Sequence, residues 1–486
     1  MDWQPPDGPI GFPAMRRLLD RVRRAGRPLP GDRPNLLLVM TDQQRWDGLG
    51  CVGGWVQTPA MDRLAAEGVR FANAYTNSPA CVPARVSAAT GRYPHQHGVW
   101  RNAHYTLAAD EPTWMRAVRD AGYRTSLFGK AHLHPHRGDL RDRAPLLQAL
   151  GLDVVDEVAG PRASARSRSN LTDLWEQAGV YEAFKRDLRD RLDGKAWVAR
   201  PSPLPLELYP DVYVGRQAAA HLRGLPRDGP WMCWVSFGGP HEPWDAPEPY
   251  ASRYDPSTMP PARQLIEDPP ERPRGVLDRR LAATVPFESG DVARLRANYA
   301  GNLALIDDQV RDVLAAVQER GELDRTAVVL VSDHGEMNGD YGLLYKQNFL
   351  DPAVRVPFVV RLPGEAGRAT AGAVAQAPVE LMDLGATLVE LAGARPVPGS
   401  SARSVVPVVG DPAGAHRPSA LSEYAQEHLL VTREYKLARN RRGRPYLLFD
   451  LGADPQESRN LVGSRAVRPI QRELMQQLQG RIDDAR

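Results

Sequence analysis

Short apolar segments that stop abruptly at polar residues recur along this chain. The first is NLLLVM at residues 35–40, which is followed at once by the polar residues TDQQ. A short apolar run bounded in this way is typical of a strand that is buried on both faces. In an open α/β sheet, ligands bind outside the carboxyl ends of such strands. This segment therefore predicts a central strand whose end faces a ligand.

Helical and extended patterns alternate after this first strand. Residues 58–68 predict a helix that begins just after Thr58, and a second strand follows. Helix and strand recur in this order in residues 113–133, and further strands run into polar turns within 231–247 and 327–342. Strands that alternate with helices predict an α/β fold with a helix-flanked, mostly parallel central sheet.

The chain divides by composition into three parts. Residues 1–33, which begin with an acid and prolines, predict an N-terminal extension, and residues 34–400 predict the main domain. A stretch rich in Pro, Gly and Ser then leads into residues 401–486, whose alternating pattern predicts a smaller C-terminal α+β subdomain built on a short antiparallel sheet. Residues 137–230 and 250–290 have weak periodicity, and we interpret them as insertions that form a cap around the sheet.

Composition excludes several classes of protein. Lys and Arg number 62 against 59 Asp and Glu, so the formal net charge is +3 and no nucleic-acid partner is expected. Three cysteines cannot build a disulfide framework for a chain of 486 residues. The N-terminus lacks the pattern of a secretory signal, and no apolar run approaches ~18 residues. We therefore expect a soluble, cytoplasmic protein with no membrane segment.

Polar residues that could bind a metal or an anion follow four of the predicted strands. They are Asp42 with Gln43, Lys130 with His132, His241, and Asp333 with His334. Carboxylate and amide oxygens suit a hard divalent cation, and an imidazole is tolerated if the ion is softer. Lysines and histidines around the same cation suit an oxyanion with several negative oxygens. The sequence therefore predicts a joint metal and anion site at this edge of the sheet.

Each of these residues alone also has an ordinary structural explanation. Asp42 could cap a turn, the His of Asp333-His334-Gly335 could bond a local backbone group, and Lys130 could end a solvated strand. These explanations would have to coincide at four successive strand ends, which favours the functional interpretation.

A stretch around one cysteine carries a resemblance to a known family. Cys81-Val82-Pro83-Ala84-Arg85, followed by Thr90-Gly91, resembles the signature of the sulfatases, within the alkaline-phosphatase-like superfamily. Further segments resemble sulfatase blocks in the expected order: TPAMDRLAAEGVRFANAY, GKAHL, PHEPW, SDHGEMNGDYG, RVPFVVRLPG and LLFDLGADPQESRNL. The resemblance thus extends over most of the chain and predicts a sulfuric ester hydrolase.

The resemblance implies a modified nucleophile and a bound metal. A formylglycine-generating enzyme would oxidise Cys81 to formylglycine; one hydroxyl of its hydrate attacks sulfur and the other later expels sulfate. The helix that we expect to begin at Pro83 would direct its positive end at the anionic substrate. The implied metal ligands are Asp42, Gln43, Cys81, Asp333 and His334. Gln and His at two of these positions depart from the commonest arylsulfatase pattern, so we expect Ca²⁺ first and Mn²⁺ or Mg²⁺ second.

The resemblance also implies roles for five further side chains. Arg85 would hold the oxygens of the nucleophile. Lys130 and Lys346 match the lysines that grip sulfate. His241 matches the residue that protonates the leaving group, and His132 matches the base that helps the sulfated enzyme release its product.

Two other functions stay open at this point. The first is a phosphonate monoester or phosphodiester hydrolase, which shares the fold and the modified cysteine. Those relatives generally carry uncharged residues in place of the Lys-x-His block, and this chain keeps Lys130 and His132. The second is a silent metal- and anion-binding protein, which would result if Cys81 is not modified.

The sequence leaves aryl, sugar and alkyl sulfate esters open as substrates. Six residues close in sequence to the motifs are candidates for the pocket lining: Trp46, Trp100, His104, Tyr105, Trp244 and Asn348.

Overall fold

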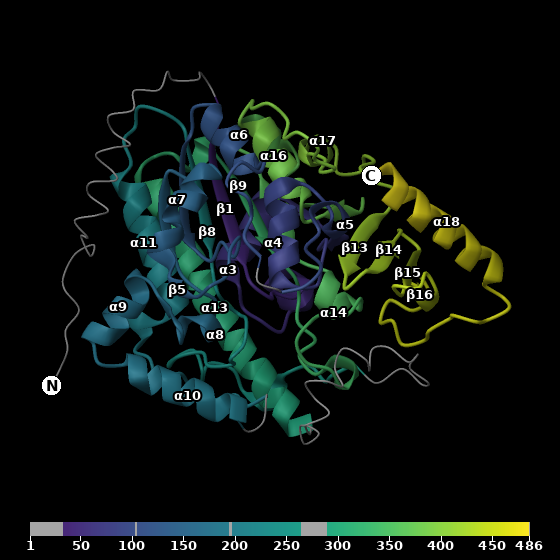
Figure 1. Cartoon of the computed structure of the whole chain (residues 1–486), viewed down its shortest axis with the longest axis horizontal. Coiled ribbons are helices and arrows are strands. Elements are labelled where there is room, and N and C mark those ends of the chain that lie inside the picture. Colours follow the sequence, from purple (N-terminus) through teal and green to yellow (C-terminus); the bar gives the residue numbers. More distant parts are fainter. Residues whose placement is uncertain (1–32, 103–104, 194–196, 264–288, 486) are drawn as a thin grey trace.

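The computed structural model describes residues 33–102, 105–193, 197–263 and 289–485, and an eight-stranded sheet runs through its centre (Figure 1). In order across the sheet, the strands are β11 (Ala373–Ala375), β2 (Val69–Phe71), β10 (Phe358–Arg361), β9 (Thr326–Ser332), β1 (Asn35–Thr41), β8 (Trp231–Ser236), β4 (Arg124–Gly129) and β6 (Val154–Glu157).

The sheet is mostly parallel, as the sequence predicts. Strand β1 pairs in parallel with β8 on one side and with β9 on the other, and β4 continues this pattern to β6. Only β10 runs antiparallel to its neighbours β9 and β2 among the described strands of this sheet. Every residue of β1 and β9 is buried, which explains their unbroken apolar runs.

Alternate residues of β1 enter two different cores. Leu36 and Leu38 point into one core, whereas Leu37 and Val39 point into the other. The first core is covered by α4 (Cys81–Thr90), α6 (Trp114–Asp120) and α16 (Asp383–Leu391). The second core is covered by α3 (Pro59–Glu67), α11 (Pro210–Gly224) and α13 (Ser289–Glu319). The sheet is therefore flanked by helices on both faces (Figure 1).

Residues 137–230 are only partly an insertion, which corrects our interpretation. They supply strand β6 of the main sheet and helix α11, which packs against α13 and β4. The many Arg and Pro residues of this segment hide that periodicity in the sequence. The other elements of the segment are β5 (Gly138–Asp139), η2 (Leu140–Arg143), α7 (Ala144–Ala149), α8 (Pro161–Ser164), β7 (Ser167–Arg168), α9 (Asn170–Gln177), α10 (Tyr181–Asp193) and η3 (Leu206–Leu208). Most of the second expected insertion, at 264–288, lies outside the described residues.

The C-terminal part contains the antiparallel sheet that the sequence predicts. Its strands are β13 (Ala420–Tyr424), β14 (Glu427–Val431), β15 (Tyr435–Arg439) and β16 (Pro445–Asp450), and helix α18 (Arg468–Asp484) packs on one face. The other face joins a core that contains Tyr75, Ala80 and Phe349 of the main domain. The domain boundaries at residues 33 and 400 stay predictions.

Shorter elements complete the described chain. They are η1 (Trp46–Gly48), α2 (Gly50–Gly53), β3 (Ala74–Tyr75), α5 (Pro94–His97), η4 (Pro256–Thr258), η5 (Leu323–Arg325), η6 (Asp340–Gly342), α14 (Asp351–Val354), α15 (Gly364–Ala369), β12 (Val379–Glu380) and α17 (Val406–Gly410). In the part of the chain that the structure describes, no helix combines the length and the apolar character needed to cross a membrane.

Candidate active site

The two predicted aspartates emerge side by side from neighbouring strands. Thr41 of β1 is in register with Ser332 of β9, so the next residues, Asp42 and Asp333, leave the sheet together. Both side chains are fully buried. Two carboxylates so close together in a protein interior would repel each other unless cations lie between or beside them.

Helix α4 brings Cys81 and Arg85 to the same place. The helix begins at Cys81, two residues earlier than the start at Pro83 that we expected, and proline is well tolerated in a first helical turn. Arg85 lies one turn further along the same helix face. Cys81 and Arg85 are each 1 % exposed, so both reach the buried strand ends from above the sheet.

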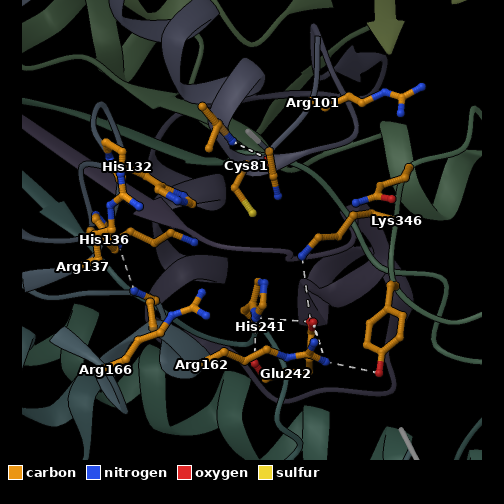
Figure 2. Close-up of a pocket in the computed structure, with 18 of the residues that line it drawn as sticks. Cys81, Arg101, His132, His136, Arg137, Arg162, Arg166, His241, Glu242 and Lys346 are labelled. Atoms are coloured by element: carbon orange, nitrogen blue, oxygen red, sulfur yellow. Dashed lines mark hydrogen bonds and ion pairs between the residues drawn. The ribbon is translucent and has the colours of Figure 1, made fainter. Parts of the chain in front are cut away.

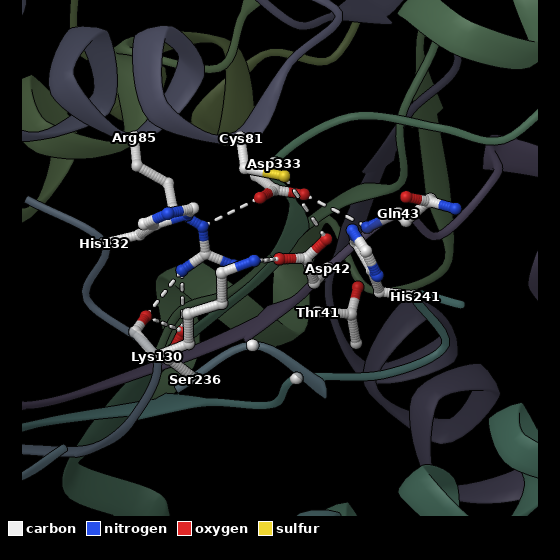
Figure 3. A network of polar contacts seen from close by, with 12 residues as sticks. Thr41, Asp42, Gln43, Cys81, Arg85, Lys130, His132, Ser236, His241 and Asp333 are labelled. Atoms are coloured by element: carbon white, nitrogen blue, oxygen red, sulfur yellow. Dashed lines mark hydrogen bonds and ion pairs between the residues drawn. The ribbon is translucent and has the colours of Figure 1, made fainter. Parts of the chain in front are cut away.

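The guanidinium of Arg85 is bound by the strand ends (Figure 3). Its Nε donates to Asp333 Oδ2 at 2.7 Å, and its Nη2 donates to Asp42 Oδ2 at 3.2 Å. Its Nη1 donates to the carbonyl of Lys130 at 2.6 Å and to Ser236 Oγ at 3.0 Å. Arg85 therefore fixes the two carboxylates and the end of β4, and its expected contact with the oxygens of the nucleophile stays a prediction.

The remaining carboxylate oxygens face a thiol and an imidazole. His334 Nε2 lies 3.8 Å from Asp42 Oδ1, 3.6 Å from Asp333 Oδ1 and 3.1 Å from Cys81 Sγ. All four ligand-type atoms lie within 4.8 Å of one another, and all four residues are buried. Arg85 bonds the Oδ2 atoms, and the Oδ1 atoms lie beside His334. This donor set fits a divalent cation.

Gln43, the fifth predicted ligand, has other partners in the structure. Its backbone has a positive φ of 70°, which is uncommon for a residue other than glycine. Its side-chain amide donates to Glu242 Oε2 at 2.8 Å and also contacts Glu336 and the ammonium of Lys346. Gln43 therefore connects the strand end to Lys346 and two buried acids.

The end of β4 places Lys130 beside Asp42. Gly129 has φ 101°, and a Cβ there would lie 1.9 Å from the carbonyl oxygen of Ser236, so only glycine fits at this point. The ammonium of Lys130 contacts Asp42 Oδ2. His132 follows with φ 58°, in the left-handed region that a non-glycine residue rarely adopts.

The predicted residues line one pocket of about 760 Å³ (Figure 2). Cys81 lies at one side of it, with Lys130, His132, His241 and Lys346 around the same space. This volume is within the range of typical small-molecule sites. All the sequence-predicted catalytic side chains except Arg85 thus line this pocket, and Arg85 is bonded to the site through Asp42, Asp333 and the carbonyl of Lys130.

Electrostatics set Cys81 apart from the other buried thiol. Burial alone would raise the pKa of Cys81, but Lys130, Lys346 and His334 outweigh burial and lower this pKa well below its ordinary value. At Cys233, burial raises the pKa to about 12. A strongly electropositive setting around one thiol is typical of a reactive position, and the setting of Cys233 is typical of an inert one.

Three buried acids near the site escaped the sequence analysis. Glu157 of β6 bonds the loop that carries His132, and Glu242 contacts His241, with 3.2 Å between carboxylate oxygen and ring nitrogen. Burial and neighbouring Glu242 raise the pKa of Glu336 to about 7. Glu242 and Glu336 stand within the PHEPW and SDHGE segments, which could have signalled them. Nothing near Glu157 in the sequence marks it.

The aromatic residues that line the pocket are not the ones that the sequence predicts. Tyr345 and Tyr424 line the pocket, whereas Trp244 lies behind Tyr345, with ring centroids 5.7 Å apart. The other candidates, Trp46, Trp100, Tyr105 and Asn348, are absent from the described lining, and His104 lies outside the described residues.

Comparisons with known proteins agree over the length of the chain. The sulfatase family model matches residues 34–394, and a model described as the C-terminal part of N-sulphoglucosamine sulphohydrolase matches residues 339–484. An arylsulfatase of Clostridium perfringens is 29% identical over 471 residues, covering 92% of this chain and 95% of that protein.

Relatives with names outside the sulfatases also match. The multifunctional alkaline phosphatase superfamily protein PehA of Trinickia caryophylli is 27% identical over 492 residues, covering 91% of this chain and 94% of that protein. The crystal structure of the phosphonate monoester hydrolase of Agrobacterium radiobacter has a TM-score of 0.77 and 25% identity, covering 93% of this chain and 96% of that one. Because the sulfatase model spans most of the chain and the strand-end residues meet as its motifs imply, this protein belongs to the sulfatase family.

Proposed function

We propose that this chain hydrolyses sulfate monoesters to an alcohol and inorganic sulfate, with a formylglycine made from Cys81 as nucleophile and one divalent cation, Ca²⁺ first. The observation that carries the proposal is the placement of Cys81. Its thiol lies 3.1 Å from the imidazole of His334 and lines the same pocket as Lys130, His132, His241 and Lys346. Family membership supports this assignment.

Different residues of this chain would bind the metal and the substrate. Asp42, Asp333 and His334 would hold the cation with the modified Cys81, and Gln43 supports this set through its bonds to Lys346 and two acids. The cation, when bound, supplies a Lewis acid that withdraws charge from the sulfate oxygens.

The pocket side chains bind the sulfate and move protons. Lys130 and Lys346 bind the non-bridging oxygens by charge-assisted hydrogen bonds. His241 protonates the bridging oxygen of the leaving alcohol. Burial and Lys130 lower the pKa of His132 to about 3, so this imidazole is neutral near pH 7 and can accept a proton as a base.

A phosphonate monoester or phosphodiester hydrolase is the second candidate. It is favoured by the similarity to the phosphonate monoester hydrolase of Agrobacterium radiobacter. A phosphodiester offers only two non-bridging oxygens to the donors Lys130, Lys346 and His241, and leaving a buried donor unpaired costs about 1–3 kcal/mol. The donor set therefore favours sulfate.

The first test is the dependence of turnover on the modification of Cys81. The protein is produced with and without a formylglycine-generating enzyme, and the Cys81 peptide is examined by mass spectrometry and hydrazide labelling. We expect sulfate release in proportion to the modified fraction, none from Cys81→Ala, and full release from Cys51→Ala, since Cys51 is an exposed thiol. Full-rate hydrolysis by protein that carries only the unmodified thiol would refute the proposal.

A further inference from the structure

The wall of the pocket away from Lys346 is rich in arginine (Figure 2). Among the described residues, the pocket lining has a single carboxylate, Glu242, and six side chains with a permanent positive charge: Arg101, Lys130, Arg137, Arg162, Arg166 and Lys346. The net charge of the whole chain is only +3, so composition gives no sign of this local excess. One sulfate group, with a single negative charge, accounts for Lys130 and Lys346 but not for the arginines.

Backbone pairing sets two of these arginines next to each other. Strands β5 and β7 form a short parallel ladder in which Gly138 is in register with Ser167. Arg137 and Arg166 directly precede these paired residues, and neighbouring strands lie about 4.8 Å apart. Arg137 and Arg166 are both exposed, and both line the pocket. Two cationic side chains that enter one pocket from neighbouring backbone segments favour a bound anion.

A third arginine extends this cluster. Arg162 lies in the short helix α8, four residues before Arg166, and lines the same pocket. Arg162 is anchored, since its Nη2 lies 3.0 Å from Glu242 Oε1 and 3.3 Å from the hydroxyl of Tyr345. It therefore connects the arginine wall to the part of the pocket that holds His241 and Lys346.

Two arginines close to this ladder provide an internal comparison: Arg168 lies on β7, and Arg141 lies in η2, just after β5. Arg141 lies 2.7 Å from Asp139 and 2.6 Å from Asp173, and Arg168 lies 2.6 Å from Glu176. By contrast, the guanidinium groups of Arg137 and Arg166 make no hydrogen bond or ion pair with any residue that the structure describes. Of these four arginines, the two that line the pocket are thus the ones without a carboxylate partner among the described residues.

We propose that Arg137 and Arg166, with Arg162 beside them, form a second anion subsite, and that the substrate is a sulfate monoester whose alcohol part carries a further anionic group. This inference rests on the proposed function and names its substrate class. The pocket of about 760 Å³ has room for a leaving group larger than a sulfate. The second anion is a carboxylate, sulfonate or sulfate, because each accepts the paired donors of guanidinium. It is bound and not cleaved.

The kinetic test uses one ester with and without a second charge. The probes are 2-naphthyl sulfate and its ring-sulfonated and ring-carboxylated derivatives, each assayed with fully modified enzyme. We expect KM to be about five- to tenfold lower for the dianionic esters, as for partly exposed ion pairs that act together. R137Q/R166Q should remove this advantage and leave kcat/KM for plain 2-naphthyl sulfate within about twofold.

The matched control is Arg168→Gln, which removes an exposed arginine of the same ladder that is already paired with Glu176 and Asp173. It should keep the preference for the dianionic esters. The preference of the wild-type enzyme should also shrink between about 0.01 M and 1 M salt, over which the Debye length falls from about 30 Å to 3 Å. Equal KM values for all three esters, or a preference that survives in R137Q/R166Q, would overturn the proposal.

A binding measurement separates this proposal from the proposed function. Calorimetry on Cys81→Ala protein compares naphthalene disulfonate with naphthalene monosulfonate, so no turnover is needed. Tighter binding of the disulfonate that is lost in R137Q/R166Q supports the subsite even if no sulfate ester is hydrolysed. Equal affinities for the disulfonate and the monosulfonate, with normal hydrolysis of 2-naphthyl sulfate, would refute the second anion subsite but not the proposed sulfatase activity.

Discussion

His132 is held in an unfavourable backbone conformation by a buried carboxylate from another strand. Glu157 Oε1 accepts hydrogen bonds from the backbone amides of Ala131 and His132, each at 3.3 Å. The same carboxylate bonds the rings of His134 at 2.7 Å and His136 at 3.0 Å. Because His136 stacks on His132, with ring centroids 4.5 Å apart, Glu157 controls both the backbone and the ring position of the proposed base. We infer that Glu157 is a positioning residue for His132.

We expect Glu157→Gln to lower kcat for sulfate esters by about tenfold or more with little change in KM, as for other supporting residues behind a catalytic group. The glutamine side chain has only one acceptor oxygen, so it cannot accept from all four donors that bond Glu157. His132 would then lose its fixed position. Steady-state kinetics on enzyme that carries formylglycine at Cys81 measure kcat and KM separately.

Asp156→Asn is the matched control for this prediction. Asp156 precedes Glu157 on β6 and is buried, but it bonds Tyr213 and Asn170 instead of the histidine loop. It should lower the melting temperature without lowering kcat selectively. If both variants reduce kcat to the same extent, Glu157 has only a structural role.

The residues that sequence analysis found and missed differ in one respect. Asp42, Asp333 and Lys130 directly follow apolar runs, so the strand end itself marks them. Glu157 and Arg137 act through neighbours that come from distant parts of the chain, and only the folded arrangement of β4, β5, β6 and β7 brings these together. A single sequence holds no local signal for such contacts.

At the scale of elements, the site is where β1, β9 and helix α4 converge. The two strands deliver Asp42 and Asp333, and the helix delivers Cys81 and Arg85. Arg85 pairs with both carboxylates, yet their Oδ1 atoms still face each other across the candidate cation position. A bound cation would therefore tie the two strand ends to the helix.

Removal of the metal should lower the melting temperature. A ligand present at about 100 times its Kd stabilises the folded state by about 2.7 kcal/mol, so we expect a fall of about 2 °C or more after chelation, reversed by Ca²⁺. Scanning calorimetry with parallel metal analysis makes the measurement. Chelation should lower the melting temperature of the Asp333→Asn protein much less. Complete loss of one metal equivalent without any change in melting temperature would contradict the assigned ligands.

The elements were predictable where their pattern was unbroken. The runs of β1 and β9, and the helix that follows Thr58, are apparent in the sequence, and the structure confirms them. The sequence predicts a start of α4 at Pro83 because proline usually marks a first helical position, whereas the helix begins at Cys81. The antiparallel direction of β10 had no signal, since strand direction depends on pairing partners rather than on composition.

At the scale of the whole molecule, a buried ion cluster joins the C-terminal sheet to the main domain. The ammonium of Lys436 on β15 contacts Asp351 of α14 and Glu457, and all three side chains are buried. Burial, with the nearby Asp351, raises the pKa of Glu457 to about 7 despite the lysine. Glu457 thus depends on Lys436 for compensation, whereas Asp351 also pairs with Arg355 at 3.2 Å.

We expect Lys436→Ala to destabilise the protein strongly, by about 3 kcal/mol or more, because it leaves the buried carboxylate of Glu457 without its cation. The melting temperature measures this. Lys185→Ala is the control, since it removes a partly exposed lysine paired with an exposed acid and should have almost no effect. The triple change to Lys436→Met, Asp351→Asn and Glu457→Gln should recover much of the loss. If the Lys436→Ala protein is as stable as the wild-type protein, the cluster does not hold the C-terminal sheet and the main domain together.

The most direct test of the proposed activity compares three esters with one leaving group. The values of kcat/KM are measured on fully modified enzyme for an aryl sulfate, the matched aryl phosphodiester and the matched aryl phosphonate monoester, and again for Lys130→Ala. We predict that the sulfate is the best substrate and that Lys130→Ala lowers its turnover by about 10²–10³, as expected when a donor to developing charge is lost, but affects the phosphorus esters far less. A phosphodiester or phosphonate monoester that is hydrolysed more than about tenfold faster than the sulfate, a difference of about 1.4 kcal/mol in transition-state binding, would contradict the assignment of this chain as a sulfate monoester hydrolase.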